Sequence, residues 1–253
     1  MSNPIKEKIF WGKEYGKVYP KLEEAGPYKE LISQCKKFVG PDIRGRWLDI
    51  GCGSGAIIEL LWRVSGGRLE QLFALDFSEE MLEHARRKIS KLSPAPEPDQ
   101  IILERHDLSF RLPYGNGYFD GAVSNLVLPY VINHEGREGR EALKAVLAET
   151  HRVLAPGGIF VWSSPIKGVN FWKVFLASWR DILNPKELVN LYYGPAILKH
   201  TLEIQKKGKN NIYNFLTTTE LTEILSGIGF AEIEMCLSLA KQAIVIKAVK
   251  QYA

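Results

Sequence analysis

The feature that most constrains this chain is the stretch of residues 46–55, where a short apolar run, RWLDI, leads into three alternating glycines. The run predicts a buried strand, and residues 56–61 after it predict a helix. Because glycine has no Cβ, the turn permits positive φ and lets the backbone approach a ligand closely. The helix N-terminus that follows favours anionic groups, since its first N–H groups have no intrahelical partner. The stretch therefore predicts a nucleotide-like ligand over the turn.

Two ligand classes fit this turn. Gly51, Gly53 and Ala56 match a dinucleotide-binding fingerprint in which alanine is allowed at the third place. Asp49, followed by Gly51, Gly53 and Gly55, resembles motif I of the class I S-adenosylmethionine-dependent methyltransferases. The turn alone does not separate the two classes.

A second acidic residue supports a nucleoside ligand. Residues 71–76 predict a buried strand that ends in Asp76, which lies 23 positions after Gly53. A carboxylate at the end of this strand accepts both hydrogen bonds of a ribose diol. Ser78 then predicts an N-cap for the next helix. Since both ligand classes use such an acid, Asp76 does not choose between them.

The order of elements predicts an α/β fold. Residues 28–39 have apolar side chains at helical spacing between two Gly-Pro pairs, and this pattern predicts a helix. Further strands are predicted at residues 101–103, 118–125 and 159–163, and the resemblance to the methyltransferases implies two more at residues 230–235 and 243–249. Strands that alternate with helices indicate an open, doubly wound, mostly parallel sheet. With 253 residues, of which 45% are apolar, we expect one domain over residues 1–253.

Five motifs in order carry a resemblance to a known family. They are residues 48–55, 76–78, 106–108 with 112–113, 118–120, and 152–158. Together they resemble the class I S-adenosylmethionine-dependent methyltransferases, in particular the small-molecule group that contains the ubiquinone and menaquinone C-methyltransferases. The resemblance covers roughly residues 40–165. It implies a Rossmann-like, seven-stranded sheet with an antiparallel last strand, S-adenosylmethionine as the cofactor and S-adenosylhomocysteine as the product.

The resemblance also implies roles for single residues around the methionine part of the cofactor. The glycine turn would hold this part, and Asp49 would steady the turn or accept from the amino group through water. Asn125 and Leu126, at the end of the fourth strand, would lie near the methionine and the acceptor. Tyr19 matches loosely an N-terminal tyrosine that closes over the methionine. The complete set of expected cofactor-binding residues is Tyr19, Asp49, Gly51, Cys52, Gly53, Gly55, Asp76, Phe77, Met81, Asp107, Leu108, Asn125 and Leu126.

The nucleoside part would contact residues at the ends of the second and third strands. Asp76 would bind the ribose, with Phe77 beside the adenine. Asp107 and Leu108 would meet the adenine amine and ring. Taken alone, Asp107 also fits an ordinary loop cap, because an acid after a strand often accepts local backbone hydrogen bonds.

Two segments lie outside the shared motifs. Residues 1–40 are expected to form an N-terminal helical cap, either laid on the core or closing as a flap over the ligand. Residues 166–215 are expected to form two helices, split near residues 184–185, as an inserted lid that binds the acceptor. This insert carries Phe171, Trp172, Phe175, Trp179, Tyr192 and Tyr193. Such an aromatic stripe fits ordinary core, a dimer face, or a lid over an acceptor pocket at the carboxyl edge of the sheet.

Methyl transfer is an in-line displacement, so alignment of the reacting atoms supplies much of the rate. A base is needed only for a poor nucleophile. His134 in the loop after the fourth strand is the best-placed candidate for this catalytic role, and His106 and His151 are further candidates.

Several acceptors can be compared. Leu126 and Val127 follow Asn125 where an adenine-N6 enzyme would carry Pro-Pro-aromatic, and no cysteine follows a proline as in a cytosine-C5 enzyme. We therefore expect a small, aromatic or hydrophobic acceptor. A protein, peptide or RNA acceptor is the alternative. A non-catalytic S-adenosylmethionine-binding protein is a third possibility. Such a protein would be marked by a ruined glycine turn or a missing strand-two acid, and both features are intact in this sequence.

Composition bears on nucleic-acid binding, metal binding and cellular location. A net charge of +4 gives no clear nucleic-acid signature, and the three cysteines lack metal-ligand spacing, so no metal is expected. No apolar run is long enough to span a membrane, and we see no secretion signal. These features favour a cytoplasmic protein, as a monomer or a homodimer.

Overall fold

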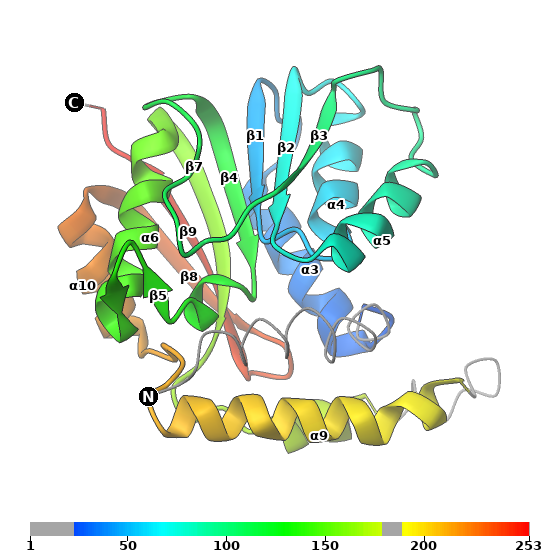
Figure 1. Ribbon diagram of the computed structural model, residues 1–253, viewed down its shortest axis with the longest axis vertical. Coiled ribbons are helices and arrows are strands. Elements are labelled where there is room, and N and C mark those ends of the chain that lie inside the picture. The colour runs from blue at the N-terminus through cyan, green and yellow to red at the C-terminus, as the bar shows by residue number, and fades with distance from the viewer. Residues whose placement is uncertain (1–22, 179–188, 253) are drawn as a thin grey trace.

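The computed structural model describes residues 23–178 and 189–252, and these residues form a single seven-stranded sheet with helices on both faces (Figure 1). The strands are β1 (Arg46–Ile50), β2 (Gln71–Asp76), β3 (Ile101–Arg105), β4 (Phe119–Asn125), β7 (Leu154–Pro165), β8 (Phe230–Ser238) and β9 (Ala243–Lys250). The helices are α3 (Gly26–Val39), α4 (Ala56–Ser65), α5 (Glu79–Ile89), η2 (Leu128–Tyr130), α6 (Gly139–Val153), α7 (Phe171–Ala177), α9 (Val189–Lys209) and α10 (Thr218–Ile228). The two-residue strands β5 (Asn133–His134) and β6 (Arg137–Glu138) form a separate hairpin.

The strand order is β3-β2-β1-β4-β7-β9-β8. β1 pairs in parallel with both β2 and β4, whereas β9 is antiparallel to its neighbours β7 and β8. This topology confirms the predicted doubly wound, mostly parallel sheet with an antiparallel last strand. The carboxyl ends of β1 and β4 lie next to each other, where the chain leaves in opposite directions across the sheet, and a ligand site is expected at such a point.

The side chains of each strand alternate between two cores. Trp47 and Leu72 pack with α3, α4 and α5 on one face, whereas Leu48 and Phe73 pack with α6 and α10 on the other. Because successive side chains of a strand point to opposite faces, a strand covered on both sides reads as a continuous apolar run. The runs in β1 and β2 have this character, and for this reason they were recognisable in the sequence.

Helix boundaries follow the predicted signals. Ser78 caps α5 by accepting from the backbone N–H of Met81, and Pro27 occupies the first turn of α3. Thr217 begins α10 in a capping box with Glu220. The fifth strand begins earlier than the predicted residues 159–163, and residues 157–158 do not form a turn before it. They lie inside β7, where the pairing with β4 shifts from Leu154 to Ile159 as an irregularity.

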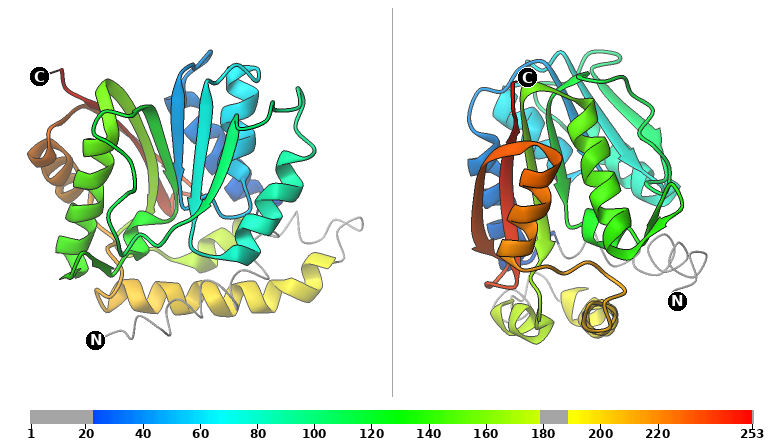
Figure 2. Two further views of the ribbon diagram at one scale, coloured as in Figure 1. Left: turned by 45° about the horizontal axis from the view of Figure 1, so that its top comes forward. Right: turned by 90° about the vertical axis from the view of Figure 1, so that its left-hand side faces the viewer.

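The described part of the insert lies at the carboxyl edge of the sheet. Figure 1 shows α9 running across the ends at which β1 and β4 finish, and Figure 2 shows α7 beside it. The two helices are joined where the N–H of Phe171 donates to Gln205 Oε1 at 2.8 Å. Within the described ranges, no helix is long and apolar enough to cross a membrane.

Candidate cofactor site

The glycine turn is held in shape by the end of β2. The N–H groups of Gly51 and Cys52 both donate to the Leu75 carbonyl at 2.8 Å. Gly51, Gly53 and Gly55 all have positive φ, at 77°, 52° and 90°. A Cβ at Gly51 would lie 2.5 Å from a methyl group of Val127, so the backbone approaches the β4 loop more closely than any other residue allows. The turn therefore requires glycine for both conformation and space.

Gly55 is the N-cap of α4 and has no side chain to satisfy the first N–H groups of the helix. Helix α5 packs tightly against it, because a Cβ at Gly55 would lie 3.3 Å from the Ala85 Cα. The N-terminus of α4 thus presents backbone donors and a positive dipole end at the turn. This geometry suits a carboxylate or another anionic group.

Asp76 connects the turn to the beginning of α5. Its Oδ2 accepts from the Gly53 N–H at 2.9 Å, and its Oδ1 accepts from the Ser78 N–H at 2.9 Å. Burial raises the pKa of Asp76 to about 6, although the N–H groups of Ser78, Gly53 and Phe77 act in the opposite direction. A carboxylate offers about four acceptor positions, so these backbone contacts leave room for a ribose hydroxyl.

Asp49 is a completely buried acid, with a side chain that is 0% exposed. Among the described residues, neither of its carboxylate oxygens has a hydrogen-bond partner. Its pKa is raised well above the usual value, first by burial and then by the negative charge of Asp76. A buried acid without a donor fits a ligand that brings positive charge or a water-mediated donor, because such a partner offsets the loss of solvation.

The surroundings of Asp49 support only one of its two predicted roles. It was expected to steady the turn or to accept from the cofactor's amino group through water. No hydrogen bond from Asp49 to the turn occurs in the described chain, and the turn is instead fixed by Asp76 and the Leu75 carbonyl. The role toward the amino group stays a prediction.

Cys52 points into the same buried region. Burial, followed by the charges of Asp49 and Asp76, raises the pKa of its thiol well above the usual value. A thiol in this environment stays protonated, so it does not act as a nucleophile or as a metal ligand. Over the described ranges, no group of three or more His, Cys, Asp and Glu residues could hold a metal ion.

The predicted adenine side is an ordered loop after β3. Asp107 Oδ1 accepts from the Ser109 N–H at 2.9 Å, which is the loop-cap geometry considered above. Leu108 is half-buried, and Phe77 lies half-buried at the end of β2. Met81 is buried in the first turn of α5. The loop cap does not exclude a contact to adenine, since a carboxylate accepts more than one hydrogen bond.

His134 is buried in β5, only 1% exposed, and its Nδ1 lies 2.6 Å from the Leu108 carbonyl. A hydrogen bond to a carbonyl requires the proton on Nδ1, so only Nε2 could act as a base. The structure thus joins His134 to the adenine-side loop, and its role as a base stays a prediction. His106 is half-buried after β3. His151 packs against Phe230 at the opposite end of the sheet, so it lies away from the site.

The end of β4 carries a hydrogen-bond chain that sequence reasoning missed. The Leu126 N–H donates to Ser163 Oγ at 2.9 Å, and Ser163 Oγ donates to Asn125 Oδ1 at 2.6 Å. Asn125 Nδ2 then donates to the Tyr28 hydroxyl at 3.0 Å. Leu126 has a φ of 54°, which is uncommon for a non-glycine residue and occurs mostly where surrounding structure enforces it. Among the residues of this hydrogen-bond network, only Asn125 and Leu126 had been predicted as site residues.

Part of the predicted lid is anchored by aromatic residues beside β4. Tyr130, in η2, has its ring centroid 5.0 Å from that of Tyr213 and 5.8 Å from that of Phe215. Phe171 is buried, whereas Trp172 is 46% exposed on α7. Two predicted residues, Tyr19 and Trp179, and the side chains of Tyr192 and Tyr193 lie outside the part that the structure describes.

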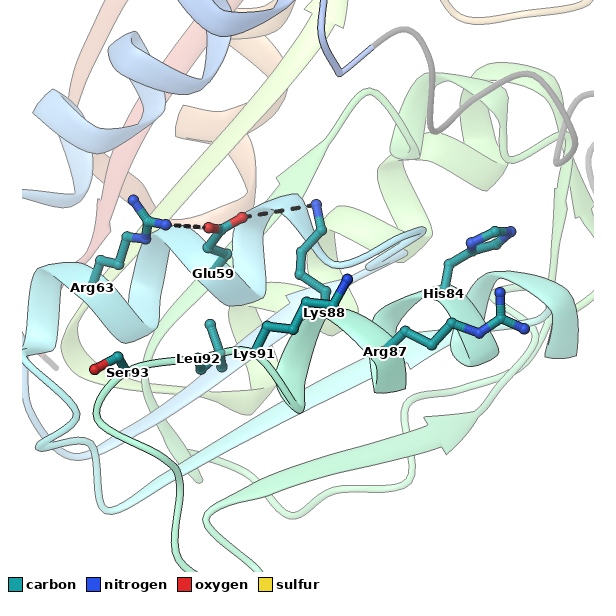
Figure 3. A pocket seen from close by; sticks show the side chains of 8 residues that line it. All are labelled: Glu59, Arg63, His84, Arg87, Lys88, Lys91, Leu92 and Ser93. Atoms are coloured by element: carbon teal, nitrogen blue, oxygen red, sulfur yellow. Dashed lines mark hydrogen bonds and ion pairs between the residues drawn. The ribbon is translucent and has the colours of Figure 1, made fainter.

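A cationic groove of about 720 Å³ lies between α4 and α5 (Figure 3). Arg63, Arg87, Lys88 and Lys91 line it together with His84. None of the predicted cofactor-binding residues lines this groove. It is therefore a neighbour of the glycine turn and not the cofactor site itself.

Comparisons with known proteins agree with this geometry. Residues 48–162 match the family model described as a methyltransferase domain. The chain is 31% identical over 159 residues to a malonyl-[acyl-carrier protein] O-methyltransferase of Erwinia pyrifoliae, which covers 61% of this chain and 51% of that protein. It is 27% identical over 158 residues to a demethylmenaquinone methyltransferase of Symbiobacterium thermophilum, which covers 59% of this chain and 56% of that protein. The chain thus spans about half the length of these curated relatives.

A solved structure shows the same fold. The N-methyltransferase NodS from Bradyrhizobium japonicum, in complex with S-adenosyl-l-homocysteine, superposes with a TM-score of 0.57 and 16% identity, over 92% of this chain and 91% of that one. At this identity the likeness concerns the fold. Taken together, the match of residues 48–162 to the methyltransferase-domain model and the seven-stranded fold around them confirm the predicted resemblance to the class I S-adenosylmethionine-dependent methyltransferases.

Proposed function

We propose that this protein transfers a methyl group from S-adenosylmethionine to a small, aromatic or hydrophobic acceptor. The observation that carries the proposal is the pair of acids at the glycine turn, the buried Asp49 and the half-buried Asp76. Asp49 and Asp76 place negative charge beside donors from α4, and the cofactor bears a sulfonium, an ammonium and a carboxylate group. Positive groups of the cofactor complement the acids, and its carboxylate complements the helix N-terminus.

Each part of the cofactor has residues that suit it. Asp76 accepts from the ribose, and Asp49 accepts from the ammonium side. Asp107, Leu108, Phe77 and Met81 surround the adenine. The resemblance supplies these roles, and the burial and hydrogen-bonding of the acids support them.

When bound, the cofactor supplies an electrophilic methyl group on a positively charged sulfur. The protein's part is to hold the reacting atoms in line and to exclude water. Asn125 and Leu126 hold the end of β4 in one conformation through Ser163 and Tyr28. A base is required only for an acceptor that must lose a proton, and His134 Nε2 is our candidate for that case.

The acceptor class rests on two supports. Two curated relatives are named for acceptors, which are demethylmenaquinone and a malonyl group on acyl carrier protein. Tyr130, Tyr213 and Phe215 form an aromatic cluster next to the end of β4. Flat aromatic side chains provide apolar area for a ring or an aliphatic chain.

An assay with methyl-labelled S-adenosylmethionine tests the proposal. The purified protein is incubated with fractions of a metabolite extract and, separately, with a protein fraction, and the labelled product is identified by mass spectrometry. Label in a small apolar molecule is the expected result, with Asp76→Ala as the inactive control. Label in protein or RNA would instead support the alternative acceptors. Binding of S-adenosylhomocysteine without any labelled product would favour a non-catalytic role.

We further propose that residues 166–215 cover the acceptor side as a lid. Its described helices, α7 and α9, lie at the carboxyl edge of the sheet, which is where the acceptor must approach (Figure 1). The segment that follows α9 is anchored to η2, since the Asn214 N–H donates to the Pro129 carbonyl at 2.9 Å. Hydrogen exchange should therefore find α7 less protected than β1 in the free protein and more protected when S-adenosylhomocysteine and acceptor are bound. Equal protection of α7 and β1 in the free protein would rule out a lid.

A further inference from the structure

The six residues 23–28, which precede α3 and form its first turn, contact the predicted cofactor site on two sides. At one end, Glu23 meets the glycine turn at Ser54. At the other end, Tyr28 meets the end of β4 at Asn125. These contacts join positions that are 31 and 97 residues apart in the sequence. No motif predicted either of them.

The contact at Glu23 is a partly buried charge network. Its Oε1 accepts from the Ser54 hydroxyl, and its Oε2 lies 2.6 Å from the Lys88 ammonium. The side chains of Glu23 and Lys88 are only 14% and 25% exposed. Lys88 also lies 3.9 Å from Glu59 on α4 (Figure 3). Loss of one partner from a pair at this depth leaves the other charge poorly solvated, so the pair resists opening more than a surface pair does.

Ser54 makes this network relevant to the cofactor. It is a buried residue of the glycine turn, between Gly53 and Gly55. Gly53 donates to Asp76, and Gly55 begins α4, so the position of Ser54 affects both predicted ligand contacts. Glu23 and Lys88 thus fix the turn from the side of α5.

The contact at Tyr28 fixes the opposite side. Tyr28 is buried, and its hydroxyl accepts from Asn125 Nδ2 at the end of the hydrogen-bond chain from Leu126 through Ser163. Leu126 has a left-handed conformation that this chain maintains. Removing the Tyr28 hydroxyl would leave a buried amide N–H without its acceptor and loosen the chain.

We propose that residues 23–28 act as a clamp across the cofactor site, in which Glu23 and Tyr28 are positioning residues for cofactor binding. The proposal rests on the proposed cofactor site. The clamp holds the glycine turn and the end of β4 in the geometry that binds the cofactor. Conversely, cofactor binding stabilises the clamp, because coupling between two sites is reciprocal.

Isothermal titration calorimetry with S-adenosylhomocysteine tests the charged end of the clamp. Glu23→Gln keeps an acceptor for Ser54 but removes the charge that pairs with Lys88, and Lys88→Met removes the same pair from the other side. Each variant should bind roughly tenfold more weakly, and the double variant should be little worse than either single one. Glu234→Gln is the matched control, because it breaks a 2.7 Å ion pair with Lys247 between β8 and β9 and should leave the dissociation constant unchanged.

Tyr28→Phe and Ser163→Ala test the other end. Both should weaken binding roughly fivefold, again without additivity. In the wild-type protein, S-adenosylhomocysteine should slow hydrogen exchange at the backbone N–H groups of residues 23–28. This second measurement does not depend on how well the variants fold.

The outcomes separate the two proposals. If the wild-type protein does not bind S-adenosylhomocysteine, the proposed function fails. The clamp is refuted if the four single variants bind S-adenosylhomocysteine as tightly as the wild type does. It is also refuted if the ligand does not change hydrogen exchange at residues 23–28 of the wild type. Variants that melt at lower temperature but bind with unchanged affinity well below melting would show a purely structural role, and this result also refutes the clamp.

Discussion

Lowering the pH from about 7.5 to about 5 should weaken binding of S-adenosylhomocysteine by about tenfold, because Asp76 gains a proton. Burial raises the pKa of Asp76 from 3.8 to about 6 in the free protein. In the proposed site, ribose hydroxyls donate to the ionised carboxylate of Asp76, so we expect the ligand to select the deprotonated form. Affinity is thus complete above the pKa and is lost as the pH falls through about 6.

The magnitude follows from the fraction of ionised Asp76. With a pKa of about 6, the acid is about 3% protonated at pH 7.5 and about 90% protonated at pH 5. Because the apparent dissociation constant rises by the inverse of the competent fraction, the expected change is about tenfold. The free protein should respond in the opposite direction. A folded-state pKa above the unfolded value gives stability that is present below about pH 4 and is lost as the pH rises through about 6.

This opposing trend gives the assay its control. Calorimetry at several pH values measures the affinity, and chemical unfolding at the same pH values measures the free energy of unfolding of the wild type and of Asp76→Asn. The difference between the two proteins removes other titrating groups, such as His151, whose pKa is lowered by burial and then by Lys250. Wild-type stability should rise relative to Asp76→Asn on acidification, by at most about 3 kcal/mol, while its affinity falls.

Two variants show which acid causes the pH dependence of binding. Asp76→Asn should bind weakly with little pH dependence, whereas Asp49→Asn should still titrate near pH 6. A flat binding profile in a folded wild-type protein would refute the reasoning. An unchanged profile in Asp76→Asn would show that another group titrates.

Three further substitutions probe the site. Gly51→Ala should lower the free energy of unfolding by about 2–4 kcal/mol and abolish S-adenosylhomocysteine binding, because Gly51 has a positive φ and a Cβ there would clash with Val127. As a control, Gly115→Ala, at a position with open space around it, should change the free energy of unfolding by less than about 0.5 kcal/mol. Thermal unfolding measures the stability of both variants, and calorimetry measures their binding. Asp49→Asn should stabilise the free protein above pH 7, because the raised pKa of Asp49 in the folded wild type means that the wild type loses stability as the pH rises. The same variant should bind S-adenosylmethionine roughly tenfold or more weakly than the wild type. A destabilised variant with normal affinity would contradict this. His134→Ala should weaken S-adenosylhomocysteine binding by about fivefold or more, because the Leu108 carbonyl loses its donor, whereas lost turnover with unchanged binding would identify His134 as the base.

The sheet and the glycine turn could be predicted because their causes are local. The continuous apolar runs of β1 and β2 follow from burial on both faces, and the positive φ of Gly51 and Gly55 leaves few other residues possible. Asp76 could also be predicted, since its place at the end of β2 follows from chain order. These features needed no knowledge of how distant helices pack.

The contacts that support the site could not be predicted in the same way. Tyr28 looked like one apolar position of an amphipathic helix, and only the packing of α3 brings its hydroxyl to Asn125. Ser163 was one residue of a buried strand until the pairing of β7 with β4 placed it opposite Asn125. The β5–β6 hairpin has two residues in each strand, too few for a periodic signal, and it decides the environment of His134.

Asp49 and Asp76 link these local and distant features. Both acids raise the free energy of the empty site at neutral pH, because burial disfavours their charged forms. A cofactor that carries positive charge offsets this unfavourable term, whereas a dinucleotide with its phosphates would increase it. The backbone geometry of the glycine turn admits either ligand class, whereas the buried Asp49 carboxylate, which has no hydrogen-bond donor among the described residues, favours a ligand with positive charge. The support that keeps the acids and the turn in place comes from Leu75, Ser78 and, in our proposal, Glu23.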